Sequence, residues 1–322
     1  MLKLKRRAFL ASVPLAAWAR SGSAAQTMFR FGTAAEGGAF MVYALAFVDA
    51  MRTVDPAFEI RSVATDGTTE NVAKLEAGDL DVAMVSGEVA HELFEGIGRA
   101  PTKLRVISAM YSTPGMFAVR SDSRYRTIGD LKGRPVVWNV RGSGIAVQAR
   151  YMMDGLGLDI DKDFQAIYTD SRTKGPAMVL DGRAVALWGG GLRWPGFIEM
   201  AHDPSGARFI VPSAEEIKTI RAKYEFLMPI KVPAGLYRGQ YDALTTVGAW
   251  SYLLARDGLD DEIGYRLASD LARIERGGLV SRQLAESTSK NTIASLPRPG
   301  LTGLGLLQPG VARYYKEKGL LP

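Results

Sequence analysis

Three short segments rich in Gly, Ser and Thr could bind an anion. They span residues 33–38, 66–71 and 139–144, and each follows a strand-like apolar run and precedes a helical pattern. The first turn of a helix has N–H groups without intrahelical partners, and the helix dipole adds about half a positive charge there. Three such helix starts facing one cleft favour a carboxylate or a similar anion.

Side chains beside these segments could add to the same site. Arg141 directly precedes Gly142, Ser143 and Gly144, so it could pair with a carboxylate through two hydrogen bonds. Arg193 lies in the loop at 188–195, where it could bind charge or stack on an aromatic ring.

Each of these interpretations has a plain alternative. In the same loop Trp188 and Trp194 could wall a pocket, but Trp188 could equally be a core residue. Arg141 could be a solvated loop residue, and glycine-rich turns are often structural. We expect Glu70 and Glu88 to be solvated.

The sequence shows no recognisable catalytic machinery. The phosphate-binding pattern GxxxxGK[ST] and the elbow GxSxG are both missing, and no motif places His91 or His202 beside a nucleophile. Without cysteine and with two histidines, the chain is a poor candidate for a zinc site. We therefore expect a protein that is not an enzyme and has no cofactor and no metal.

The first 25 residues have the pattern of an export signal. A basic start at 3–7 precedes an apolar run at 8–18 and the small residues at 23–25. The apolar run is shorter than the about 20 residues that span a bilayer. Arg6 and Arg7 resemble a twin-arginine signal. A plain Sec signal and an uncleaved anchor remain alternatives.

The basic net charge comes largely from this segment. The chain has 40 basic and 34 acidic residues, a net charge of +6. Five of the basic residues and none of the acidic ones lie within 1–25, which leaves 35 minus 34, or +1. No Lys/Arg run follows, so we expect no nucleic-acid partner. No later stretch approaches about 18 apolar residues, so we expect no stable membrane insertion after processing.

Strand-like and helical patterns alternate along the chain, which predicts parallel sheets with crossover helices. The expected strands are 29–33, 58–63, 80–85, 107–111, 116–120, 136–140, 164–168 and 184–188. The expected helices are 38–52, 69–77, a single turn at 127–133, 144–155, 174–181, 259–275 and 309–318. In two places a helix should end at a glycine, Gly78 or Gly182, directly before a buried strand.

This order predicts two α/β lobes. The chain should pass into the second lobe near 109–121, where Pro114 and Gly115 separate two strands, and return near 235–250. We expect lobe 1 to comprise residues 26–115 plus 240–322 and lobe 2 to comprise residues 116–239.

Several of these segments resemble the TAXI family of solute receptors, the extracytoplasmic components of TRAP transporters. The matching pieces are residues 31–38, 67–71, 75–83, 109–111, 128–133 and 142–144. The resemblance implies the α/β fold of a two-lobe periplasmic binding protein (type II), in which each lobe is a mostly parallel sheet flanked by helices and the ligand cleft lies between the lobes. It also implies a periplasmic location, a small organic anion such as a carboxylate, dicarboxylate or amino-acid-like solute, and delivery to TRAP membrane subunits. We expect a monomer.

The sequence departs from the family pattern at some positions. Phe40 and Met41 stand where an aromatic pair with tyrosine is usual, Ile145 replaces a threonine, and Val185 replaces an acidic residue. The segment at 192–194 lacks the usual small Pro/Ser character. These changes suggest a larger or more apolar solute.

The candidate ligand-binding residues are Gly37, Gly38, Phe40, Thr68, Thr69, Asn71, Ser86, Tyr111, Arg141, Gly142, Ser143, Gly144, Trp188 and Arg193. Two other functions stay open: a solute-sensing receptor for a signalling partner, and an enzyme on the same fold. An ABC-type importer is an alternative transport partner.

Overall fold

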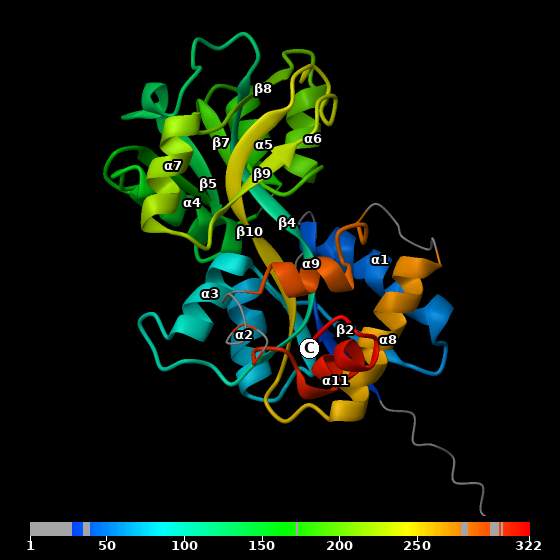
Figure 1. Ribbon diagram of the computed structural model, residues 1–322. Helices are drawn as coiled ribbons and strands as arrows, with labels where there is room; N and C mark the ends of the chain where they lie inside the picture. The colour runs from blue at the N-terminus through cyan, green and yellow to red at the C-terminus, as the bar shows by residue number, and fades with distance from the viewer. Residues whose placement is uncertain (1–27, 35–38, 172, 278–282, 297–302, 304) are drawn as a thin grey trace, which may run out of the picture.

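Two lobes joined by two long strands make up the structure (Figure 1). A computed structural model describes residues 28–34, 39–171, 173–277, 283–296, 303 and 305–322. The expected export signal therefore lies outside the described residues, as do Gly37 and Gly38. The connecting strands, β4 (Arg105–Arg120) and β10 (Leu244–Ala255), pair antiparallel and run from one lobe into the other. The expected two-lobe α/β fold is confirmed.

Lobe 1, the lower half of Figure 1, contains the mixed sheet β2–β1–β3–β10–β4. Its remaining strands are β1 (Phe29–Gly32), β2 (Ile60–Val63) and β3 (Val82–Val85). β1 pairs parallel with β2 and β3, and β10 pairs antiparallel with β3. The carboxyl ends of the parallel strands point toward lobe 2, which is where a ligand is expected in such a sheet.

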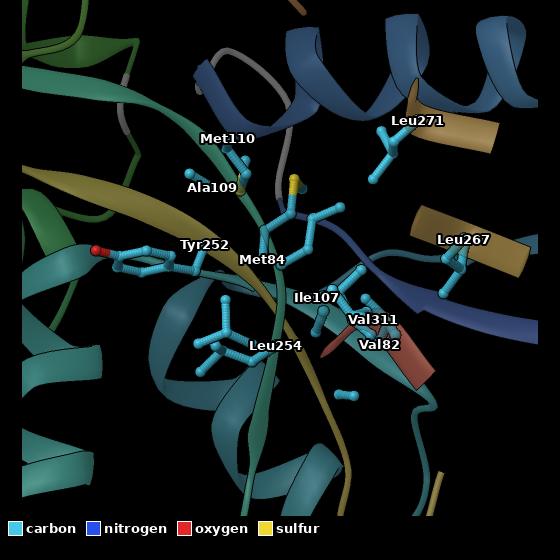
Figure 2. Packing of buried hydrophobic residues seen from close by; sticks show 14 of the residues in the cluster. Val82, Met84, Ile107, Ala109, Met110, Tyr252, Leu254, Leu267, Leu271 and Val311 are labelled. Atoms are coloured by element: carbon cyan, nitrogen blue, oxygen red, sulfur yellow. The ribbon is translucent and has the colours of Figure 1, made fainter. Parts of the chain in front are cut away.

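Helices cover the sheet of lobe 1. They are α1 (Ala39–Val54), α2 (Thr68–Glu76), α3 (Gly87–Glu95), α8 (Asp261–Arg276), α9 (Ser289–Ala294) and α11 (Pro309–Glu317). Figure 2 shows the core that they enclose, where Leu267 and Leu271 of α8 lie over Val82 and Met84 of β3. The apolar face of α8 repeats at helical spacing, so burying it fixes the helix on the sheet.

Lobe 2, the upper half of Figure 1, continues the sheet as β4–β7–β5–β6, with β8 on β4 and β9 on β10. Its strands are β5 (Pro135–Val140), β6 (Gln165–Thr169), β7 (Ala186–Gly190), β8 (Ala207–Ile210) and β9 (Met228–Val232). Its helices are η1 (Gly129–Leu131), α4 (Gly144–Gly155), α5 (Lys174–Leu180), α6 (Pro195–His202) and α7 (Ala214–Lys223).

The expected strand break at Pro114 and Gly115 is wrong, because β4 runs straight through it. β4 pairs with β10 up to Pro114 and with β7 from Gly115 onward, so the proline lies where the strand exchanges partners. Opposite it, Gly248 of β10 pairs with both Pro114 and Met228 of β9. A Cβ on Gly248 would lie 2.0 Å from the Thr113 carbonyl oxygen, so the two strands cross too closely for a side chain.

The helix ends at Gly78 and Gly182 are confirmed, since both glycines have left-handed φ values, 77° and 84°. The sequence patterns missed α3, α6, α7 and α9. Among the helices that the structure describes, none is long and apolar enough to cross a membrane.

Candidate functional site

A cavity lies between the two lobes, where the first turns of several helices meet. Measured as the space that the centre of a water molecule can occupy, its volume is about 70 Å³. Its walls come from lobe 1 residues Ala39, Phe40, Thr68, Ser86, Glu88, Tyr111, Thr113 and Ser251, and from lobe 2 residues Asn139, Ser143, Gly144, Ile145, Gly190 and Trp194. α1, α2, α3 and α4 thus begin at the cavity.

The lobes are in close contact at one edge of this cavity. The Thr69 hydroxyl, at the start of α2, donates a hydrogen bond of 2.8 Å to the Gly142 carbonyl in lobe 2. A Cβ on Gly144 would lie 2.4 Å from the Ser86 hydroxyl oxygen and 3.2 Å from that of Thr68. Only glycine at the start of α4 allows this approach, so the structure has the closed arrangement of the lobes.

Small hydroxyl groups hold the helix starts in place. The Thr68 hydroxyl oxygen accepts a hydrogen bond from the backbone N–H of Ser86 at 3.2 Å, which links α2 to the residue before α3. Ser143 caps α4, because its hydroxyl oxygen accepts from the N–H of Ala146 at 3.4 Å. These hydrogen bonds fix the starts of α2, α3 and α4 beside the cavity.

Glu88 is the acidic side chain of the cavity, and our expectation that it is solvated is wrong. Its exposed fraction is 1%. The Gln148 side chain, from α4 in lobe 2, donates 2.9 Å to its carboxylate and 2.7 Å to the Thr113 carbonyl. Burial raises the pKa of Glu88 to about 7, while hydrogen bonds from its own backbone N–H and from Gln148 oppose the increase. In the described lining no Lys, Arg or His accompanies it.

Asn139, at the end of β5, has an unusual backbone. Its φ is 65°, in the left-handed region that few residues other than glycine adopt. The side-chain amide donates 2.5 Å to the Trp188 carbonyl. The other amide atom, Oδ1, is buried and has no hydrogen-bond partner among the described residues. Strained residues with unsatisfied polar atoms are typical of ligand sites.

The structure brings many of the candidate residues together. Those lining the cavity are Phe40, Thr68, Ser86, Tyr111, Ser143 and Gly144, and Thr69 and Gly142 join the lobes beside it. Asn71 lies behind α2, where its side-chain amide donates to the carbonyls of Thr33 and Met84 at 2.9 and 2.8 Å. It holds α2 against the ends of β1 and β3.

Three candidates lie elsewhere. The Arg141 guanidinium stacks 3.7 Å from the centre of the Tyr168 ring and lies 3.8 Å from Asp161, with 63% of its side chain exposed. Trp188 is a core residue whose indole N–H donates 2.9 Å to the Ile145 carbonyl. Asn139 of β5 and Gly190 of β7 line the cavity instead.

Arg193 is next to the cavity rather than in it. Its φ is 60°, and its backbone N–H donates 2.9 Å to the Tyr237 hydroxyl. Its side chain lines a second chamber of about 280 Å³, which shares Ala39 and Tyr111 with the first cavity. The arginine thus lines a neighbouring chamber and not the first cavity.

Sequence reasoning missed several lining residues, above all Glu88, Asn139 and Thr113. The signal for Asn139 was its place near the end of a predicted strand, as the first residue of the segment at 139–144. Glu88 lies two residues after Ser86, itself at the end of β3, but the short α3 was not predicted.

Comparison with known proteins agrees with this architecture. A family model described as "NMT1-like family" matches residues 31–319. The periplasmic sulfonate-binding protein SsuA from Methylobacillus flagellatus KT is 14% identical over 91% of this chain and 95% of its own, with a TM-score of 0.52. An ancestral arginine-binding protein bound to arginine is 12% identical over 81% and 98%, also with a TM-score of 0.52. At these identities the likeness is one of fold.

Proposed function

Because the chain belongs to the NMT1-like family, we propose that it is a periplasmic solute receptor that closes its two lobes around a small organic acid. The observation that carries this proposal is the cavity between the lobes, at which helices of both lobes begin. The hydrogen bond from Thr69 to Gly142 supports it further, because it forms only when the lobes meet. In this proposal β4 and β10, which connect the lobes, act as the hinge for closure.

An acid group fits the starts of α2 and α4. First-turn residues Thr68, Gly144 and Ile145 line the cavity, and the N–H groups of a first helical turn have no intrahelical partners. The two helix dipoles both favour a negative charge there. The charge would be held by backbone and hydroxyl groups, since no Lys or Arg belongs to the described lining.

Each lobe would move largely as a rigid body. One apolar core draws on residues from 29 to 110 and from 252 to 321, and two smaller cores draw on residues between 116 and 249. This division supports the expected boundary near residue 115. For the return to lobe 1 we propose residue 250 instead of the expected 240, because Val247 and Ala249 pack in a core of lobe 2.

We further propose that residues 1–25 direct export, that Arg6 and Arg7 select the twin-arginine route, and that the receptor delivers its solute to TRAP membrane subunits. The segments shared with TAXI receptors support the TRAP partner. A binding role is favoured over catalysis because Glu88, the acidic residue of the cavity, has no nucleophile–base arrangement beside it in the described lining. Delivery to an ABC importer is the competing outcome, and co-purification with either set of membrane subunits distinguishes the two.

A thermal-shift screen of organic acids with the mature chain tests the binding function. A ligand that binds only the folded state raises the melting temperature, by an amount that grows with concentration. We expect at least one carboxylic acid to do so and to reduce the radius of gyration in small-angle X-ray scattering. A shift with sugars or metal cations and none with any acid would contradict the proposal.

A further inference from the structure

We propose that Glu88 and Asn139 form a pair of acceptors that recognises a protonated amine on the solute, so that the receptor selects amino acids over acids lacking nitrogen. This inference rests on the proposed function. It adds recognition of the amine, because the helix starts favour only the negatively charged group of the solute. Its two residues come from opposite walls of the cavity, Glu88 from α3 in lobe 1 and Asn139 from the end of β5 in lobe 2.

The orientation of the Asn139 amide is fixed by its neighbour. A carbonyl oxygen can only accept, so the side-chain atom 2.5 Å from the Trp188 carbonyl must be the NH₂ group. The oxygen atom therefore points the other way. It is buried, the residue is 1% exposed, and it has no hydrogen-bond partner in the described part of the chain. A buried acceptor of this kind requires a donor, and a bound solute would supply one.

The backbone of Asn139 gives a second, independent reason. A residue other than glycine with a φ of 65° is held there at a cost by the structure around it. Asn adopts this conformation more easily than most residues, because its short polar side chain can bond locally. The conformation places the amide in the cavity wall, at the point where β5 ends and the turn toward α4 begins.

Glu88 needs a positive partner for its own reason. Its carboxyl is buried in the cavity wall, and Gln148, which donates a 2.9 Å hydrogen bond to it, is a neutral side chain. A buried carboxylate is costly unless a charge or several donors compensate for it. No Lys, Arg or His of the described lining provides that charge, whereas an ammonium group on the solute would.

Together the two groups of lining residues suit a zwitterion. The starts of α2 and α4 favour the carboxylate, and the acceptors of Glu88 and Asn139 favour the ammonium. Because Glu88 and Asn139 belong to different lobes, an ammonium between them is fully bonded only when the lobes are closed. Recognition of the amine would thus contribute to closure.

Matched solutes test this inference on the unchanged mature chain. Each set has one carbon skeleton: alanine, lactate and propionate, or glutamate, 2-hydroxyglutarate and glutarate, extended to the other amino acids as the screen requires. We expect one amino acid to bind at least about tenfold more tightly, by titration calorimetry, than the members of its set without nitrogen. Equal affinity within the set would overturn the inference and leave the proposed function intact. Binding of no acid at all would overturn both.

Variants assign the preference to the two residues. Glu88→Gln keeps the side-chain shape, and Asn139→Gly keeps the left-handed backbone while removing the acceptor. We expect each to reduce the preference for the amine to less than about threefold, with a smaller effect on the deaminated acid. Arg141→Ala is the matched control, since that side chain stacks on Tyr168 outside the cavity. A preference that survives in either variant would contradict the role assigned to that residue, so the assignment stays testable if the other variant folds poorly.

Discussion

The hydroxyl of Thr69 donates a 2.8 Å hydrogen bond to the carbonyl of Gly142, joining the start of α2 in lobe 1 to the turn before α4 in lobe 2. The two residues lie 73 positions apart in the chain. Because they belong to different lobes, the bond forms only when the lobes are closed. It also brings together two of the segments in which the sequence predicted anion-binding helix starts.

Removing this bond should weaken solute binding. Thr69→Val keeps the branched shape and loses the donor, and a typical hydrogen bond contributes about 1 kcal/mol, or about fivefold in affinity. Titration calorimetry measures the change. Thr53→Val is the matched control, because its hydroxyl bonds only to the Asp49 carbonyl within α1. If the two variants bind the solute equally well, the bond does not stabilise the closed form.

Enlarging Gly144 should block closure without harming the fold. In Gly144→Ala the new Cβ would lie 2.4 Å from the Ser86 hydroxyl oxygen, so the lobes cannot approach fully. Alanine is the better helix former, so the free energy of unfolding without solute should not fall. We expect at least about tenfold weaker binding and a larger radius of gyration with saturating solute.

Gly129→Ala is the control for this substitution, since a Cβ there has its nearest neighbour at 3.7 Å. A Gly144→Ala protein that binds normally would mean that the lobes need not come this close. One that merely loses stability would point to a structural role instead.

Glu88 should make stability depend on pH. Its pKa is raised by burial from 4.5 to about 7, so the folded protein binds this proton more tightly than the unfolded chain does. The resulting stabilisation is fully present below pH 4.5 and is lost as pH rises through 7. The loss is on the order of 3 kcal/mol.

Urea unfolding at pH 5 and pH 8 checks this dependence. We expect the free energy of unfolding of the solute-free protein to fall more over this range than that of Glu88→Gln. Parallel pH dependences in the two proteins would show that Glu88 is not the group responsible.

Arg141 should be dispensable for binding, although it directly precedes the Gly-Ser-Gly turn. Its guanidinium lies on the Tyr168 ring with most of its side chain exposed. Arg141→Ala should change solute affinity by less than about twofold, because exposed contacts of this kind contribute little. A loss of tenfold or more would mean that the arginine reaches the solute.

Local sequence patterns predicted many of the helices and strands of this molecule. Residues 144–155 were expected to form a helix and do so as α4, and Gly78 and Gly182 end helices as their position before buried strands suggested. These features depend on residues close together in the chain, so hydrophobic spacing and capping residues determine them.

The site itself was only partly predictable, because side-chain direction depends on distant contacts. Arg141 comes only two residues after Asn139, yet Asn139 lines the cavity and the Arg141 side chain stacks on Tyr168 outside it. Glu88 resembles a surface residue of a short polar helix. The side chain that hydrogen-bonds it, Gln148, lies 60 positions away in the sequence.

The most direct test is a crystal structure of the mature protein with a bound solute. The solute is the one that raises the melting temperature most, and the structure shows where its acid group binds. We expect the acid group against the first turns of α2 and α4, beside Thr68 and Gly144, with the lobes closed around it. A solute bound elsewhere, or held by Arg193 in the second chamber while the first cavity is empty, would contradict this expectation.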